Sequence, residues 1–401
     1  MDILTPRTRP DPIALLAIAG SFSGAALRIC DGLLPRIARD FGVTPSVAGH
    51  VVISFSIGYG LSQLLFGPLS DRFGKLRMMA IALYGCAIGS VVSASMQDLA
   101  GLVALRGLWG MAAAGIVPLA MAWIGDNVSY ADRQPALARF LLGTLSGMTA
   151  GQFAGGLFAE SDWGWRGAFT LLGAGFALIA TVLAIRAREY PAPPRNDASI
   201  HRGFAFQLRS VLVIPWARVV LLAVLFEGIF LLGPLSYLPS MLHARDGLSL
   251  GMASGLLALY AVGGLIYAAS ARHIVTRLGE RLMVSIGSIL MGTCFLAWWL
   301  SPPWQLAAPI ALALGFGTYL FHNTLQTHAT QMAPLARGTA VSLFAFSLFS
   351  GQAIGVLFAG WIIDHHGYAP MLAAAAVVLP STGTALACLL PRRMSPTAAE
   401  T

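Results

Sequence analysis

Four ionisable residues of the 401-residue sequence stand inside long apolar stretches: Arg28, Asp31, Arg106 and Glu227. A charge at the centre of a membrane helix costs about 2.5–3.5 kcal/mol on insertion scales, so it normally faces a partner or a hydrated cavity. A carboxyl group in a poorly hydrated cavity can hold and release a proton near neutral pH. Proton exchange and the binding of a polar ligand are therefore the chemistry that these residue types predict.

Counting along the predicted helices places the four charges at different depths. Arg28 and Asp31 lie roughly 22 and 27 Å from Ile13 along one helix, and their spacing of three residues puts them on one face. Arg106 lies roughly 10 Å below the outer surface, in the same outer half as Arg28 and Asp31. Glu227 lies roughly 15 Å into its helix, near the midplane. Glu227 is the first candidate for a proton carrier and Asp31 is its rival. A structural Arg28–Asp31 pair and a packing hydrogen bond at Glu227 are the alternatives.

Polar side chains also recur along the tenth predicted helix. Thr318, His322 and Gln326 follow one another at a spacing of four residues, with Tyr319 and Asn323 beside them. Helical repetition places such residues on one side, where they would line a substrate cavity. Hydrogen-bonded helix packing is the alternative.

The elements that must position these residues are membrane helices. The chain is 57% hydrophobic and only 10% charged, whereas soluble domains carry about 25% charged residues. Charge-free stretches such as Val51–Ser70 and Gly338–Ile363 match the ~20 residues that a spanning helix needs. Backbone groups in hydrocarbon must be satisfied internally, which requires helices. The sequence predicts an all-α membrane protein with 12 transmembrane helices in the cell inner membrane.

The net charge of +8 follows from the membrane topology. With a cytoplasmic N-terminus, 19 of the 25 basic residues fall in cytoplasmic segments and four on the opposite side. Cytoplasmic segments of membrane proteins are enriched in Lys and Arg, so both termini are predicted inside. We therefore expect no nucleic acid partner. The four cysteines are scattered without CxxC pairing, and we expect no metal site.

An internal repeat divides the chain. The segment Gly151–Ala159 matches Gly351–Ala359 at six of nine positions, 200 residues apart. This predicts two pseudo-symmetric six-helix bundles, residues 1–186 and 216–401, with the cargo pathway between them. The polar, proline-containing segment 187–215 is predicted to be a cytoplasmic linker with a short surface helix around 204–211. Chance similarity among small residues is the alternative.

A charged motif follows the second predicted helix, and it reads Gly67-Pro-Leu-Ser-Asp71-Arg72-Phe-Gly74-Lys75. It predicts a tight turn in which Gly74 supplies conformational freedom. An ordinary basic loop is the alternative, but the ordered pattern is more specific and resembles the signature loop of the major facilitator superfamily. The resemblance covers nearly the whole chain. It implies a conformational gate in which Asp71, Lys75 and Asp126 form a charge cluster that holds the cytoplasmic side closed.

Two further motifs resemble those of the 12-helix drug/proton antiporters. Arg106-Gly-Leu-Trp-Gly110 resembles a fourth-helix motif whose arginine is linked to proton transfer, with Trp109 in place of the usual glutamine. The fifth helix resembles the antiporter motif, with Gln152 in place of the usual proline, although helix packing explains its spacing equally well. The residues assigned to this antiporter-like packing are Gly147, Gly151, Gln152, Gly155, Gly156, Gly351, Gln352 and Gly355.

These features predict a proton-coupled secondary transporter of a small organic molecule that works by alternating access, with efflux by antiport favoured. A proton symporter for metabolite uptake is the alternative. A transporter-like sensor or an integral-membrane enzyme is the alternative from another class, although the catalytic motif HExxH is absent. We expect a monomer in contact with membrane lipid, driven by the proton gradient without any cofactor.

Overall fold

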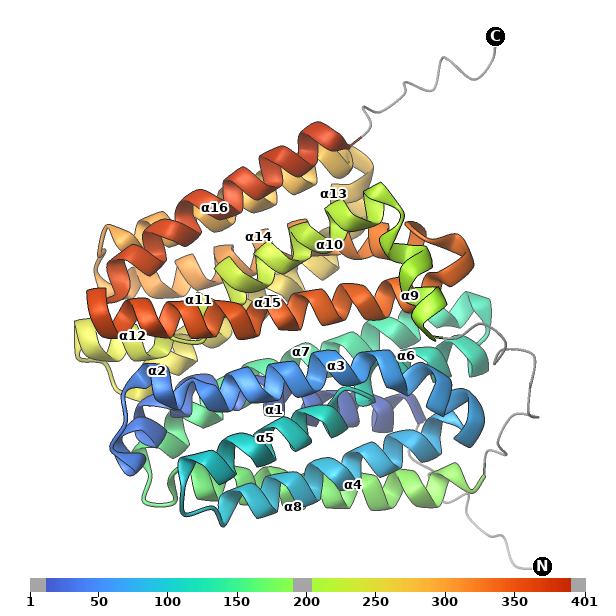
Figure 1. Ribbon diagram of the computed structural model, residues 1–401, viewed down its shortest axis with the longest axis horizontal. Coiled ribbons are helices and arrows are strands. Elements are labelled where there is room, and N and C mark those ends of the chain that lie inside the picture. The colour runs from blue at the N-terminus through green and yellow to red at the C-terminus, as the bar shows by residue number, and fades with distance from the viewer. Residues whose placement is uncertain (1–11, 190–203, 391–401) are drawn as a thin grey trace, which may run out of the picture.

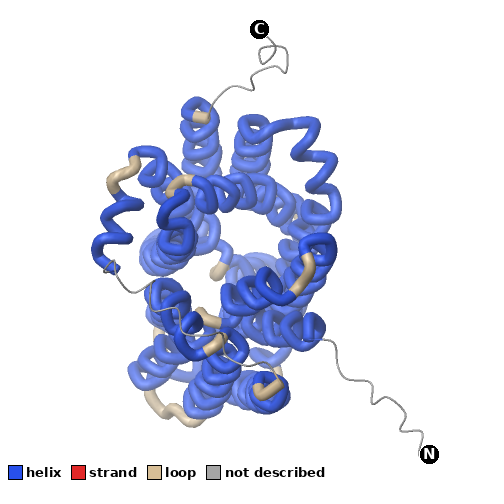
Figure 2. The backbone as a smooth tube through the Cα atoms, turned by 90° about the vertical axis from the view of Figure 1, so that its right-hand side faces the viewer, coloured by secondary structure: helices blue, strands red, loops and turns tan. Residues whose placement is uncertain are grey.

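The computed structural model describes residues 12–189 and 204–390, except for the side chains of 67–72, 130, 131, 204, 205 and 335. Within these ranges every regular element is a helix (Figure 2). The first helices are α1 (Pro12–Phe41), α2 (Pro45–Ala48), α3 (His50–Phe73), α4 (Lys75–Ala94), α5 (Leu99–Ala113), α6 (Ile116–Asn127), α7 (Tyr130–Glu160) and α8 (Gly164–Ala187). The later helices are α9 (Phe204–Leu212), α10 (Pro215–Glu227), α11 (Gly233–Leu235), α12 (Leu238–Asp246), α13 (Leu250–Trp299), α14 (Ala307–Gln331), α15 (Arg337–His366) and α16 (Tyr368–Leu389).

The helices are long and apolar enough to make this a multi-pass membrane protein. Ten described segments qualify as membrane spans. One of them, the 50-residue α13, breaks at Gly279, whose φ of 72° lies outside the helical range. The 31-residue α7 is not among the ten, because its many Gly, Ser and Thr residues make it less apolar. The all-α membrane fold is confirmed, and the count of 12 spans stays a prediction.

The helices form two groups, α1 to α8 and α10 to α16, which lie side by side in Figure 1. In the first group α1 packs on α7, α3 on α5, and α4 on α8. In the second, α10 packs on α15, and the two parts of the long α13 pack on α14 and α16. The groups meet where α7 contacts α13 and where α3 contacts α15. We call these two contacts the seam. The predicted boundaries at 186, 187, 215 and 216 stay predictions.

The sequence repeat corresponds to one helix–helix contact made twice. Four glycines that approach a neighbouring backbone closely form the pairs Gly151 with Ala25, Gly155 with Ile29, Gly351 with Leu225, and Gly355 with Ile229. The residue numbers of each pair in the second group are 200 higher than those of the matching pair in the first group. Small residues allow this approach in membranes, where packing rather than hydrophobicity joins helices.

The charged motif between the second and third predicted helices is almost entirely helical. Helix α3 continues to Phe73 and α4 begins at Lys75, so the predicted tight turn is present and is confined to Gly74. Gly74 has a φ of 88°, which glycine adopts without steric cost and which turns the chain within one residue. Gly279 does the same inside α13.

The part of the linker that the structure describes contains the predicted short helix, α9. Its Gln207 accepts a 2.9 Å hydrogen bond from Thr339 of α15, which holds α9 against the second group. The termini and residues 190–203 lie outside the described residues. We call the end of the molecule at which α7 stops and α13 begins the Glu160 end, and the opposite end, with Gly74, the Lys75 end.

Candidate functional site

Glu227 is buried at the end of α10 and is joined to His322 of α14. The Nδ1 atom of His322 lies 3.0 Å from both carboxylate oxygens of Glu227. The Glu227 side chain is 1% exposed and that of His322 is 20% exposed. The imidazole is therefore the exposed member of the pair, and the two groups can share one proton.

The backbone beyond Glu227 is irregular. A π-helical turn spans Gly228–Leu232 and leads into α11. Pro234 has no N–H to donate to the carbonyl of Phe230, which weakens a regular α-helix there. Gly228 packs against the backbone of α15, where a side chain would collide with Gln352. Single π-helical turns often occur at functional sites, and this one fixes the level at which Glu227 faces α14.

Arg28 and Asp31 form the ion pair that their spacing predicts. Arg28 Nη1 lies 3.1 Å from Asp31 Oδ2, and both side chains are almost fully buried. Ser236, from the second group, and Arg106 also lie close to the Asp31 carboxylate. Asp31 therefore stands between two guanidinium groups at the boundary between the two groups of helices.

Arg106 lies within the core of the first group. Its guanidinium carbon is 4.1 Å from the ring centre of Phe55 and 4.6 Å from that of Trp109. It also donates to the carbonyls of Val51 and Ala26, both at 3.4 Å. Aromatic faces stabilise a desolvated cation, and Trp109, which replaces the usual glutamine of the motif, supplies one of them.

The two halves of the site meet at a pair of tyrosines. Tyr260 of α13 and Tyr319 of α14 both lie within electrostatic range of Arg28 from the first group and of Glu227 from the second. Tyr319 packs flat against Gly264. Tyr319 is thus within electrostatic range of Arg28 and of Glu227, and Glu227 contacts His322.

The remaining residues of the predicted polar stripe have different surroundings, and their role as the lining of a substrate cavity stays a prediction. Thr318 is buried and donates to the carbonyl of Leu314 at 2.8 Å. Asn323 donates to the hydroxyl of Tyr267 at 3.0 Å, in a separate small cluster. Gln326 is exposed. Positions four apart rotate by about 40° around a helix, so each side chain finds a different partner.

The predicted packing residues of α7 face two directions. Gly147, Gly151 and Gly155 contact α1, whereas Gly156 contacts Leu250 and Ser254 of α13 across the seam. Gln152 and Gln352 are both buried, and each has one polar atom without a partner among the described residues: the nitrogen Nε2 in Gln152 and the oxygen Oε1 in Gln352.

Glu160 is a seam residue that sequence reasoning missed. Its carboxylate accepts hydrogen bonds from the backbone N–H groups of Leu250, at 2.6 Å, and Gly251, at 3.3 Å. These are the first residues of α13, where the helix dipole favours negative charge. The only signal in the sequence was an acidic residue at the end of an apolar helix.

The predicted gate is described in part. Lys75 and Asp126 form an ion pair at the Lys75 end. The side chains of Gly67, Asp71 and Arg72 lie outside the described residues, and their role stays a prediction. The second group has a corresponding contact with the acidic and basic residues exchanged, in which His328 Nε2 lies 3.2 Å from Glu280 Oε2. The signal that could have found it is that Glu280 follows Gly279 as Lys75 follows Gly74.

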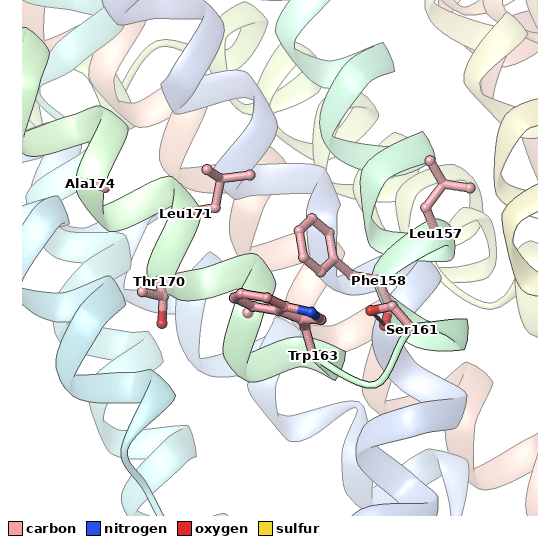
Figure 3. A pocket seen from close by; sticks show the side chains of 8 residues that line it. Leu157, Phe158, Ser161, Trp163, Thr170, Leu171 and Ala174 are labelled. Carbon is pink, nitrogen blue, oxygen red and sulfur yellow. Dashed lines mark hydrogen bonds between the residues drawn. The ribbon is translucent and has the colours of Figure 1, made fainter.

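An apolar groove between α7 and α8 lies away from this site (Figure 3). Leu157, Trp163 and Leu171 line it and are exposed, with Trp163 at 76%. No ionisable side chain lines the groove, whereas the ionisable groups that are buried in the described residues lie inside the bundles and at the seam. The groove is part of the apolar surface that faces lipid.

A duplicated bundle of apolar helices with ionisable groups gathered at the seam defines a membrane transport protein rather than an enzyme. The sequence profile of the Major Facilitator Superfamily matches residues 16–347 and 273–401, and the chain belongs to this family.

The chain is similar over most of its length to bacterial membrane proteins. It is 26% identical over 386 residues to the uncharacterized transporter YgaY of Escherichia coli O157:H7, covering 92% of this chain and 93% of that one. It is 25% identical over 373 residues to the inner membrane transport protein YnfM of E. coli K12, covering 91% and 86%. In structure it resembles a bacterial homolog of the human lysosomal transporter Spinster in an inward-facing, unoccupied conformation. That likeness has a TM-score of 0.72 at 19% identity, covers 95% of this chain and 97% of the other, and supports the fold.

Proposed function

We propose that this transporter couples the movement of protons to that of a small organic molecule, and that it works as an antiporter that exports its cargo. The observation that carries the proposal is the buried Glu227–His322 pair. A carboxylate buried at the middle of a membrane protein is costly unless it serves binding or proton transfer. An imidazole with an exposed edge gives that carboxylate a route to water.

Antiport is proposed because α7 resembles the antiporter motif of the 12-helix drug/proton antiporters. Tyr260 and Tyr319 lie within electrostatic range of both Arg28 and Glu227, so a cargo bound beside them and the Glu227–His322 pair influence each other. An antiporter carries the proton and the cargo in opposite half-cycles, and a symporter carries both in the same one.

The test is Glu227→Gln in vesicles with an imposed proton gradient, using a cargo found by screening dyes, drugs and organic acids. Gln keeps the shape and cannot release a proton, so accumulation driven by the gradient should stop while cargo-for-cargo exchange survives. Asp31→Asn is the comparison variant, since it removes the other buried carboxylate, which is the rival proton carrier. It should alter cargo affinity and keep coupling. Full proton-driven transport by Glu227→Gln, with coupling lost in Asp31→Asn, would assign the proton to Asp31.

Direction is measured in the same vesicles. Proton flux opposite to cargo flux supports antiport, and flux in the same sense establishes the symporter instead.

We also propose that the protein is a monomer in the inner membrane with the Lys75 end and both termini in the cytoplasm, because the basic residues concentrate there. Reporter fusions at each terminus test this orientation, and a periplasmic signal from either one contradicts it.

A further inference from the structure

Several buried hydrogen-bond donors of the first group have no partner among the described residues, including Nη1 of Arg106 and Nε1 of Trp109 in its core. Two others, on α1 and α7, belong to Arg28 and Gln152. Arg28 uses Nη1 for Asp31, and its Nη2 makes no hydrogen bond. The Nε2 atom of Gln152 makes none either. Arg28 is 4% and Gln152 is 3% exposed. A buried donor without an acceptor costs about 1–3 kcal/mol, and more when it is charged. The unpartnered donors of Arg28 and Gln152 are therefore expected to bind an acceptor.

The packing of α1 on α7 places these two donors opposite each other. A side chain at Gly24 would meet Met148, and a side chain at Gly32 would meet Gly156. Arg28 is midway between Gly24 and Gly32, and Gln152 is midway between Met148 and Gly156. Positions four apart lie on one face of a helix. The two helices therefore present Arg28 and Gln152 at the same level.

This level lies one helical turn inside a closed part of the seam. Gly32 and Gly156 both contact Ser254 of α13, and Gly156 also contacts the backbone of Leu250. These contacts close the Glu160 end beyond Arg28. On the side of the second group, the phenol groups of Tyr260 and Tyr319 lie within electrostatic range of Arg28. The donors therefore stand at the seam, where a cargo passes between the two groups.

The buried charge of the first group is positive. Its buried ionisable residues, within the described part, are Arg28, Asp31 and Arg106, which is two cations and one anion. The carboxylate oxygens of Asp31 have the Arg28 ion pair but no donor in good hydrogen-bond geometry. They lie close to both guanidinium groups, however, so a cationic ligand that approached them would be repelled.

We infer that the cargo is an organic anion, and that its carboxylate is bound by Nη2 of Arg28 and Nε2 of Gln152. A carboxylate has two acceptor oxygens and suits two convergent donors, one of them charged. It also offsets the surplus positive charge. The inference rests on the proposed transport function, for which it names the class of cargo.

The experiment is isothermal titration calorimetry on the full chain in lipid nanodiscs, without a proton gradient. The probes are two sets with matched skeletons: benzoate, benzamide and benzylamine, and hexanoate, hexanamide and hexylamine. We expect the acids to bind about tenfold or more tightly than their amides and amines, because only they form charge-assisted hydrogen bonds with Arg28.

Three variants locate the binding. Arg28→Gln should weaken acid binding about tenfold or more, and Gln152→Leu about threefold or more. Gln352→Leu is the matched control, since Gln352 occupies the equivalent position in the second group and its unpartnered atom is an acceptor. It should leave acid binding unchanged. If Arg28→Gln fails to fold, Arg28→Lys keeps the charge and should bind acids more weakly while still preferring them over amines.

Three results would each overturn the inference. Amines or amides bind as tightly as the acids, or acid binding is unaffected by both Arg28→Gln and Gln152→Leu, or no acid of the panel binds. Glu227→Gln separates this result from the proposed function. Acid binding in that variant supports the inference even when proton coupling proves absent, and proton-driven transport of a cation overturns the inference while leaving the coupling intact.

Discussion

Arg28 and Asp31 are three positions apart and form an ion pair at 3.1 Å. Arg186 and Glu189 repeat this spacing and distance at the surface. The two pairs differ in burial, since Glu189 is 46% exposed and Asp31 is fully buried. A buried ion that loses its partner keeps its desolvation cost without compensation. The exposed pair is solvated and contributes little.

We therefore expect Asp31→Asn to destabilise the protein by about 3–5 kcal/mol, because it leaves Arg28 and Arg106 buried without an anion. Glu189→Gln should cost about 0–1 kcal/mol. The measurement is the melting temperature in detergent. The double variant Arg28→Gln with Asp31→Asn should recover part of the loss. Equal melting temperatures for the Asp31 and Glu189 variants would contradict a compensated buried pair.

At the scale of the elements, the close approach of α7 to α1 and of α15 to α10 depends on glycine. An added methyl group at Gly151 would collide with the Cα and carbonyl of Ala25, and at Gly355 with the backbone of Ile229. Backbone atoms cannot move aside as a flexible side chain can. The helices must separate instead, which displaces Arg28 on α1 and Glu227 on α10.

Gly151→Ala and Gly355→Ala should each lower stability by about 1–3 kcal/mol, the usual cost of overpacking. Gly125→Ala is the control, since nothing lies within 4 Å of the added methyl group. It should be neutral or stabilise by up to about 1 kcal/mol, because alanine favours the helix. Melting temperatures and transport rates of the three variants test this. A Gly125 variant as damaged as the other two would show that the losses do not come from close helix packing.

The sequence predicts most elements because apolar length and charge-free stretches are local properties. The 200-residue repeat also shows where α7 and α15 pack, since Gly151 and Gly351 make the same contact. The tight turn at Gly74 was predicted from its charged motif, but local polarity does not reveal that one glycine suffices. The polar stripe on α14 stays a prediction, because the sequence does not show that Asn323 pairs with Tyr267.

At the scale of the whole molecule, contacts between distant segments are what the sequence does not show. It identifies Arg28 and Glu227 as costly charges, but the tyrosines that connect them come from α13 and α14. The Glu227–His322 pair joins residues 95 positions apart. Glu160 looks like the end of a helix until α13 is placed beside it. Each of these contacts depends on how the two groups of helices are docked.

Glu160 decides how firmly the Glu160 end stays closed. Its carboxylate binds two N–H groups at the start of α13, across the seam. A carboxylate at a helix N-terminus is worth about 0.3–1 kcal/mol, and up to ~2 kcal/mol where it is partly buried. The neutral amide of Glu160→Gln loses most of that interaction, since it carries no charge for the helix dipole to attract. Opening at this end requires that these bonds break, so the substitution favours the open state.

We expect Glu160→Gln to raise the population open at this end about two- to thirtyfold. The reporter is Ser254→Cys in a chain whose four native cysteines are replaced, because Ser254 is fully buried at the closed seam. The rate of maleimide labelling in nanodiscs measures opening. Glu189→Gln, the same change at an exposed ion pair, should leave the rate unchanged. High salt screens the dipole interaction, so the difference between Glu160→Gln and the parent should narrow as salt rises. Identical labelling rates at low salt, with both proteins folded, would show that Glu160 does not hold this end closed and that the glycine contacts close it instead.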